Sequence, residues 1–261
     1  MALPRDWTEK LVASGVRKPA AYGGGEYFPI PPVAPEQDDF KVALVFPDRY
    51  EVGMSNQGLS LMYCRLREMH GVFVDRVFAP WIDMEEEIRK GEFPLFSRDF
   101  GIDIASFDLI AISLSSELNY TNVLTILELG GLEIRAVNRT DKQPLVIAGG
   151  ACASHGEPMA PFVDVFGIGD GELLLPDFVS RLIEIGYKAR GRVVLPELET
   201  MPGIYVPSLH PPTGKPGGFQ TVEGVSVKKV FVEDLNSRPN LDFFPVAATE
   251  SVFDRVSVEI T

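Results

Sequence analysis

Runs of consecutive apolar residues recur through the first two-thirds of the chain, at 41–46, 72–79, 107–113, 144–148 and 163–168. Runs that do not alternate with polar residues are typical of strands buried on both faces of a sheet. Stretches with helix-like apolar spacing lie between or after them, at 59–69, 84–90, 119–129 and 173–185. The pattern predicts an α/β fold over residues 41–187, with a doubly wound, mostly parallel, Rossmann-like sheet.

The two flanks of this region have a different texture. Residues 1–40 are rich in Pro and Gly and predict an irregular N-terminal arm, with a short helix at 7–14. After residue 187, prolines and glycines interrupt short β-type runs at 204–206, 225–232 and 255–260. We therefore expect residues 188–261 to form a Pro-rich β appendage or linker. Because the last run alternates up to Thr261 without a polar tail, and an unpaired strand needs a neighbour, we expect the natural protein to continue.

Polar and small residues gather in the four loops that follow the predicted strands, at 47–58, 113–119, 149–157 and 167–172. In a doubly wound sheet, ligands bind outside the carboxyl ends of the strands near the point where the strand order reverses. The loops therefore predict one shared ligand crevice. The alternative is that Gly, Ser, Asn and Asp are present only because turns favour them.

The charge of the chain excludes several partners. Lys and Arg number 24 against 37 Asp and Glu, which gives a formal net charge of −13. Nucleic acid and anionic membrane surfaces both need clustered basic residues, so we expect neither as a partner. No apolar run is long enough to span a bilayer, and residues 1–10 lack a signal-peptide core. We therefore expect a cytoplasmic chain, in which the two cysteines, Cys64 and Cys152, are free thiols.

The motif Asp48-x-Tyr50-x-x-Gly53 follows the first strand, Ser113-x-Ser115 a later one and Gly149-Gly150 the next. In order and placement they resemble the Asp-x-His-x-x-Gly, Ser-x-Leu and Gly-Gly segments of cobalamin-binding domains. The cobalt-ligating His of that pattern is replaced here by Tyr50, and a neutral phenol is a poor metal ligand. We therefore expect no metal ligand from this loop. An ordinary α/β domain with glycines for backbone reasons is the alternative.

Three further segments carry candidate chemistry. Gly167-Ile-Gly-Asp-Gly-Glu172 opens a helix, and its glycines would let the backbone approach a cofactor tail or partner, although a plain helix start is the alternative. Ser115-Ser-Glu-Leu-Asn-Tyr120 offers polar groups that either cap a helix or hold a ligand. Cys152 and His155 are close enough in sequence to suggest a nucleophile and base, but no third member is visible.

Together these motifs resemble the N-terminal region of radical SAM proteins that carry a cobalamin-binding domain. The resemblance covers residues 41–261 and rests on Tyr50-Glu-Val-Gly-Met-Ser-Asn56-x-Gly58, Val77-Phe-Ala-Pro-Trp81, Tyr120-Thr-Asn-Val123, Ile147-Ala-Gly-Gly150 and Ile168-Gly-Asp-Gly-Glu172. In that family Val256–Thr261 looks like the first barrel strand, with a Cys-x-x-x-Cys-x-x-Cys loop next. The resemblance therefore implies an N-terminal fragment without radical chemistry of its own. It places a 4Fe–4S cluster and S-adenosylmethionine in the missing barrel.

The resemblance implies an accessory domain that holds cobalamin, or a degenerate cobalamin site, above its own radical SAM catalytic domain. The alternative is a non-catalytic interaction module that docks a catalytic domain and binds no cofactor. We expect no catalytic residue and no metal ligand in the chain. The predicted cofactor-binding residues are Asp48, Tyr50, Gly53, Asn56, Gly58, Ser113, Ser115, Glu117, Tyr120, Gly149, Gly150, Gly169, Asp170, Gly171 and Glu172.

Overall fold

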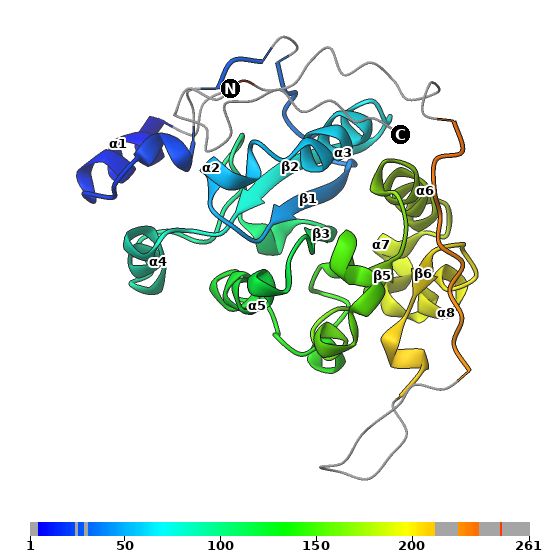
Figure 1. Cartoon of the computed structure of the whole chain (residues 1–261). Coiled ribbons are helices and arrows are strands. Elements are labelled where there is room, and N and C mark those ends of the chain that lie inside the picture. The colour runs from blue at the N-terminus through cyan, green and yellow to red at the C-terminus, as the bar shows by residue number, and fades with distance from the viewer. Residues whose placement is uncertain (1–4, 24–25, 29–30, 212–223, 235–245, 247–261) are drawn as a thin grey trace, which may run out of the picture.

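A six-stranded sheet forms the centre of the computed structural model, which describes residues 5–23, 26–28, 31–211, 224–234 and 246 (Figure 1). Its order is β2-β1-β3-β4-β5-β6. The strands are β1 (Phe40–Phe46), β2 (Val72–Phe78), β3 (Leu109–Ser113), β4 (Leu145–Gly149), β5 (Val165–Gly167) and β6 (Ile204–Tyr205). The first five are parallel, and β6 pairs with β5 in antiparallel fashion. The predicted mostly parallel, doubly wound α/β fold is thus confirmed.

Helices cover both faces of the sheet (Figure 1). On one face, α3 (Gln57–Arg67) and α6 (Gly171–Glu184) pack over a core that includes Leu44 and Phe178. On the other, α4 (Ile82–Arg89) and α5 (Tyr120–Leu129) pack over a second core. Because strand side chains alternate between faces, the same strands supply both cores, which explains why their sequences are continuously apolar.

Helix α3 shows how the local sequence sets an element boundary. Asn56 has extended backbone angles, and its side-chain Oδ1 accepts a hydrogen bond from the backbone N–H of Leu59 at 2.8 Å. This is an N-cap, which satisfies one of the amide donors left open at a helix start. The cap fixes where the loop after β1 ends and therefore where the first helical side chains lie.

Helix α1 (Arg5–Ala13) of the N-terminal arm packs on the segment after α4, where Trp7 contacts Phe93 and Phe96 edge to face. The helix predicted at 7–14 thus forms, shifted toward the N-terminus.

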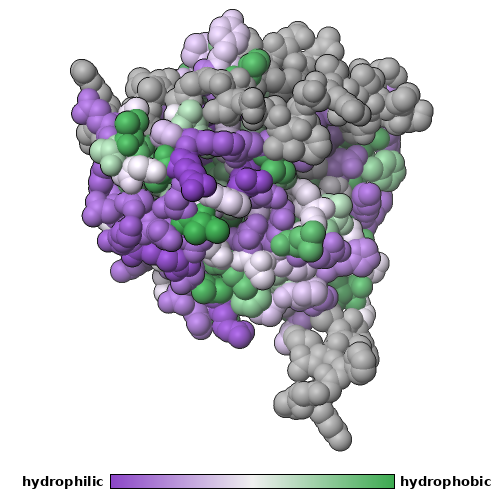
Figure 2. All heavy atoms as spheres, turned by 60° about the vertical axis from the view of Figure 1, so that its left-hand side comes forward, coloured by the Kyte–Doolittle hydropathy of each residue, from purple (hydrophilic) through white to green (hydrophobic). Residues whose placement is uncertain are grey.

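The face of the molecule on the side of α1 and α4 is largely hydrophilic, with hydrophobic residues in small separate patches (Figure 2).

The region after residue 187 adds α7 (Tyr187–Arg190), α8 (Leu195–Leu198) and β6. Of its three predicted β-type runs, 204–206 becomes β6, whereas 225–232 forms no strand and makes one isolated bridge, from Val230 to Gly169. The run at 255–260 lies outside the described residues. The domain boundary at residue 187 stays a prediction, since β6 belongs to the sheet although it follows that point.

Two further observations bear on the sequence-based expectations. Cys64 and Cys152 are both buried free thiols. In the described ranges, no helix combines the length and apolarity that crossing a bilayer requires.

Candidate functional site

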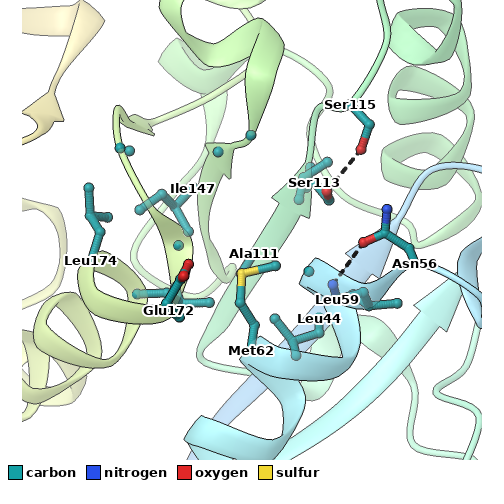
Figure 3. Close-up of a pocket in the computed structure, with 18 residues that line it drawn as sticks. Leu44, Asn56, Leu59, Met62, Ala111, Ser113, Ser115, Ile147, Glu172 and Leu174 are labelled. Carbon is teal, nitrogen blue, oxygen red and sulfur yellow. Dashed lines mark hydrogen bonds between the residues drawn. The ribbon is translucent and has the colours of Figure 1, made fainter. Parts of the chain in front are cut away.

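A cleft of about 280 Å³ opens at the carboxyl ends of β1, β3, β4 and β5, between α3 and α6 (Figure 3). The strands β1 and β3 are neighbours, although β2 lies between them in the sequence. This is the switch point of the 2-1-3-4-5 strand order, where the connections leave toward opposite faces and the loops part. We call this cavity the switch-point cleft. It lies where the loop composition predicts a ligand crevice.

Apolar side chains form the inner part of the switch-point cleft. Leu44, Ala111 and Ile147 reach it from three adjacent strands, while Met62 of α3 and Leu174 of α6 flank it (Figure 3). Further along β3 and β4, the positions two residues on are Ser113 and Gly149, which face the same side of the sheet. On β4 the side chain shrinks from Ile147 to Gly149, and on β3 both Ala111 and Ser113 are small, so the rim of the cavity is lined by small residues.

The glycines of the cleft fall into two groups. At Gly150 and Gly169 a Cβ atom would lie 3.0 Å or less from backbone atoms of Leu114 and Val230, so the chain itself excludes a side chain there. At Gly167 and Gly171 the close atoms, at 2.8 Å, belong to the side chains of Leu174 and Met62, which would have to move. At Gly149 a Cβ would meet only the Gly167 carbonyl oxygen at 3.5 Å, and at Gly58 only the Asn56 Oδ1 at 3.4 Å. Packing within the chain therefore does not require glycine at 149 or 58, and their small size leaves space in the cleft.

Polar groups gather at the rim. The Ser113 and Ser115 hydroxyls lie 3.3 Å apart, and Glu172 is in the first turn of α6 (Figure 3). Asn56 uses Oδ1 as the helix cap, and its Nδ2 has no partner in the described part of the chain. The lining contains no Lys, Arg or His. The cleft therefore offers hydroxyl and amide groups and one carboxylate, Glu172, above an apolar floor, which suits a polar-edged, largely apolar group better than a phosphate.

The comparisons with known proteins bear on this region directly. Residues 58–207, more than half of the chain, match the family described as "Radical SAM proteins, N-terminal". The chain belongs to this family. The match runs from the second residue of α3 through β6 and so includes both walls of the switch-point cleft. A search of curated proteins finds no match. Membership implies a 4Fe–4S cluster and S-adenosylmethionine in the catalytic domain of such proteins.

The radical SAM N-terminal domain brings together nine of the fifteen predicted cofactor-binding residues at the cleft: Asn56, Gly58, Ser113, Ser115, Gly149, Gly150, Gly169, Gly171 and Glu172. The other six are not among the lining residues: Asp48, Tyr50, Gly53, Glu117, Tyr120 and Asp170. The Asp48-x-Tyr50-x-x-Gly53 motif lies both outside the matched residues and outside the cleft lining.

Tyr50 points into a buried cluster of charged groups instead of the cleft. Its hydroxyl donates a hydrogen bond to Glu26 at 2.6 Å, and the Arg98 guanidinium lies 4.2 Å from its ring centroid. Burial raises the pKa of Tyr50 well above its ordinary value, and the Glu26 carboxylate acts in the same direction. In this radical SAM N-terminal domain Tyr50 is therefore a neutral phenol committed to an internal partner.

The remaining members of this group have structural contacts. A Cβ on Gly53 would lie 2.5 Å from the Phe78 ring, so glycine there allows α2 (Tyr50–Gly53) to pack against β2. Asp48 accepts a hydrogen bond from the Arg49 backbone N–H at 2.7 Å. Asp170 Oδ2 accepts one from the Val232 N–H at 2.8 Å, which ties the segment 224–234 to the start of α6.

The segment around Glu117, Tyr120 and Cys152 gives no sign of an activated nucleophile. Burial raises the pKa of the Cys152 thiol, and the nearby Glu117 carboxylate raises it further. His155 is exposed and makes no hydrogen bond with Cys152 among the described contacts. A thiol catalyst needs its thiolate form, so the geometry does not support a Cys152–His155 pair.

Sequence reasoning missed the apolar lining of the cleft, notably Leu44, Met62, Ala111 and Ile147. The available signal was the two-residue period of a strand, which puts Ala111 on the side of Ser113 and Ile147 on the side of Gly149. Met62 has no comparable signal, because a core position and a cleft position look alike on an apolar helix face.

Proposed function

We propose that this chain is the accessory N-terminal domain of a radical SAM enzyme and that its switch-point cleft holds cobalamin or a degenerate form of that site. The observation that carries the proposal is Gly149, where the chain's own packing leaves room for a side chain and the sequence supplies none. Family membership supports the accessory role. Its place in a whole enzyme, next to a catalytic domain of the same protein, is part of the proposal.

The size and chemistry of the cleft fit one end of cobalamin. A cavity of about 280 Å³ has room for a planar benzimidazole group but not for a corrin ring. Leu44, Ala111 and Ile147 would contact the apolar base, and Ser113 and Asn56 would meet polar atoms next to it. The corrin would then lie outside the cavity, over the small residues of the rim.

The chain would not ligate cobalt through the loop after β1. Tyr50 is directed at Glu26, and no group of three or more His, Cys, Asp or Glu in the described residues is placed to hold a metal ion. When bound, cobalamin supplies a methyl-carrying cobalt centre. The residues of this chain would bind and orient it and keep water from its apolar base.

The test is retention of hydroxocobalamin, followed by the visible spectrum after desalting. We expect the chain to retain colour and Gly149→Leu to lose it, because the new side chain would enter the cleft. Gly91→Ala is the control for a general loss of stability, because alanine at φ +80° strains the backbone at a position outside the cleft lining. Absence of retained colour in the unmodified chain, or equal retention in Gly149→Leu, would overturn the cobalamin proposal.

A second candidate function is an interaction module that docks the catalytic domain and binds no cofactor. It is favoured by large apolar side chains exposed near the strand ends, Leu118 at 88% and Phe231 at 57%. Supplying the catalytic domain as a separate chain tests it. Co-elution that Leu118→Ser weakens, together with no cobalamin retention, would favour this function over the first.

A further inference from the structure

A second cavity, of about 190 Å³, lies on the other side of β1 from the switch-point cleft. Its walls come from the arm at 17–22, from the loop after β1 at 49–51 and from the end of β2 with the residues after it, 78–81. We call it the arm pocket. It shares no lining residue with the switch-point cleft, so a ligand in the arm pocket would not occupy the proposed cobalamin site.

The charge of the arm pocket is opposite to that of the chain. Its lining contains Arg17, Lys18 and Arg49 against one carboxylate, Glu51, in a protein whose formal net charge is −13. Lys18 Nζ and Glu51 Oε1 form an ion pair at 2.9 Å. Burial alone would raise the pKa of Glu51, but the hydrogen bond from Lys18 and the charge of Arg49 outweigh it and lower that pKa. Glu51 is therefore ionised and already paired.

The two arginines have no anionic partner of their own. Within the described residues, the guanidinium groups of Arg17 and Arg49 make no hydrogen bond or ion pair with another side chain. Arg17 does donate a hydrogen bond to the Asp83 carboxylate, at 2.7 Å, but from its backbone N–H and not from its guanidinium group. A pair of unpaired guanidinium groups beside one cavity is a fitting donor set for an oxyanion, because each offers planar, forked N–H groups.

Aromatic side chains provide the rest of the surface. The Arg49 guanidinium lies 4.5 Å from the ring centroid of Trp81, which is 44% exposed, and Tyr22 and Tyr50 also line the cavity. The Tyr22 hydroxyl accepts a hydrogen bond from the Trp81 backbone N–H at 3.0 Å, so the arm holds this wall in place. A flat, partly exposed indole next to a cation favours a flat, unsaturated ligand.

The arm adopts a strained conformation at this point. Lys18 has φ +54°, the one positive φ of a non-glycine residue among the described ranges. The left-handed region costs an ordinary residue about 1–2 kcal/mol, and such outliers persist where surrounding contacts hold them. Three contacts hold the arm at the pocket: the Lys18–Glu51 ion pair, the Arg17 N–H bond to Asp83 and the Trp81 N–H bond to the Tyr22 hydroxyl.

We propose that the arm pocket binds a small organic anion with a flat, unsaturated body, either an aromatic carboxylate or an aryl phosphate. Arg17 and Arg49 contact its oxyanion, and its ring lies against Trp81 and Tyr22. The carboxylate and phosphate forms share this chemistry, and the probes below separate them.

Trp81 makes binding directly observable, because the chain contains two tryptophans and the other, Trp7, is packed against Phe93 and Phe96. In a Trp7→Phe chain, Trp81 is the sole reporter. We titrate it with benzoate and with phenyl phosphate, and with benzamide as the neutral isostere of benzoate. The expected result is saturable quenching by at least one anion and none by benzamide, with the tighter anion identifying the oxyanion class.

The variants test the donor set. Arg49→Gln and Arg17→Gln are each expected to weaken anion binding about tenfold, since each removes a charge-assisted hydrogen bond. Arg89→Gln is the matched control, because it removes an arginine that pairs with Glu85 and Glu128 away from the pocket. Weaker binding at higher salt is a second readout that needs no substitution at the site. Absence of saturable quenching, equal binding of benzamide, or unchanged affinity in both arginine variants would overturn the proposal.

Discussion

Gly169 and Val230 form an isolated parallel bridge that leaves no room for a side chain on the glycine. A Cβ on Gly169 would lie 2.8 Å from the Val230 nitrogen and closer still to its carbonyl oxygen. Val230 N–H donates to Ile168, and its carbonyl accepts from Asp170 N–H at 2.9 Å. Since Gly169 also lines the switch-point cleft, the outgoing segment 224–234 is attached directly to the cleft rim.

Gly169→Ala should therefore release this segment. The new methyl group both clashes with Val230 and strains a backbone at φ +147°, a combined cost of about 1–3 kcal/mol. We expect faster hydrogen exchange at the amides of Val230 and Val232, with the central strands unchanged. Gly149→Ala is the control, because its Cβ meets only ordinary contact distances. Unchanged exchange at both amides in Gly169→Ala would contradict the attachment.

Asp75 predicts a pH dependence of stability. Burial and the nearby Asp99 raise the pKa of Asp75 to about 8, against hydrogen bonds from Ser97 and from backbone N–H groups. The folded state then binds more protons than the unfolded state, whose Asp has its ordinary pKa near 3.8. The associated stability is complete below the unfolded pKa and is lost as the pH rises through about 8, at up to about 1.4 kcal/mol per pH unit.

Urea unfolding at pH 5, 6.5 and 8 measures this effect. Asp75→Asn should flatten the decline, since the amide does not titrate, although its NH2 group cannot accept the two hydrogen bonds that the carboxyl oxygen in that place accepts. Asp177→Asn changes an exposed carboxylate and serves as the control. If the stability of the unmodified chain and of Asp75→Asn falls equally as the pH rises from 5 to 8, then Asp75 is not the group whose deprotonation destabilises the fold.

Much of the fold follows from local sequence. The apolar runs at β1 to β5 needed no long-range information, because strands covered on both faces carry few polar residues. Asn56 could be identified as a helix cap, and the glycines at 149 and 150 could be assigned to the rim, since both depend on chain-local geometry. The run at 225–232 was predicted as β-type, but among the described residues its backbone pairs only at Val230, with the turn at 168–170, which is too short to pair with a whole strand.

The direction of Tyr50 could not be predicted, because its partner is distant in the sequence. Glu26 belongs to the arm, 24 residues earlier, and accepts hydrogen bonds from both Tyr50 and Arg76. A motif reports spacing along the chain but not which buried group lies opposite. The same reason hides the arm pocket, whose arginines come from two segments more than thirty residues apart.

Tyr50→Phe tests whether the Asp48-x-Tyr50-x-x-Gly53 motif supports the fold or the cofactor site. Loss of a hydrogen bond to a buried carboxylate should cost about 1.5–3 kcal/mol of unfolding free energy. Tyr27→Phe, at an exposed tyrosine, should cost far less. Retention of hydroxocobalamin should not change in Tyr50→Phe, because Tyr50 does not line the cleft. A loss of cobalamin with normal stability would place this loop in the cofactor site after all.

Arg76 carries the largest expected single-site effect on stability. It lies on the edge strand β2, fully buried, and donates hydrogen bonds to Glu26 and to Asp99, the latter at 2.6 Å. Asp99 also accepts the Tyr63 hydroxyl at 2.8 Å, so one guanidinium joins the arm, the segment at 97–99 and helix α3. Removing one partner of a buried ion pair leaves an uncompensated charge, which costs about 3–5 kcal/mol.

Arg76→Leu should therefore strongly lower the urea concentration at the midpoint of unfolding. A double variant that adds Glu26→Gln is the more specific test. Adding Glu26→Gln to Arg76→Leu should restore part of the stability, because it removes a carboxylate that has lost its main counter-ion. In the unmodified background, Glu26→Gln should instead destabilise, because Arg76 and Arg98 then face one carboxylate fewer. A change of sign between the two backgrounds identifies charge compensation, whereas additive losses would show that packing alone holds the arm on β2.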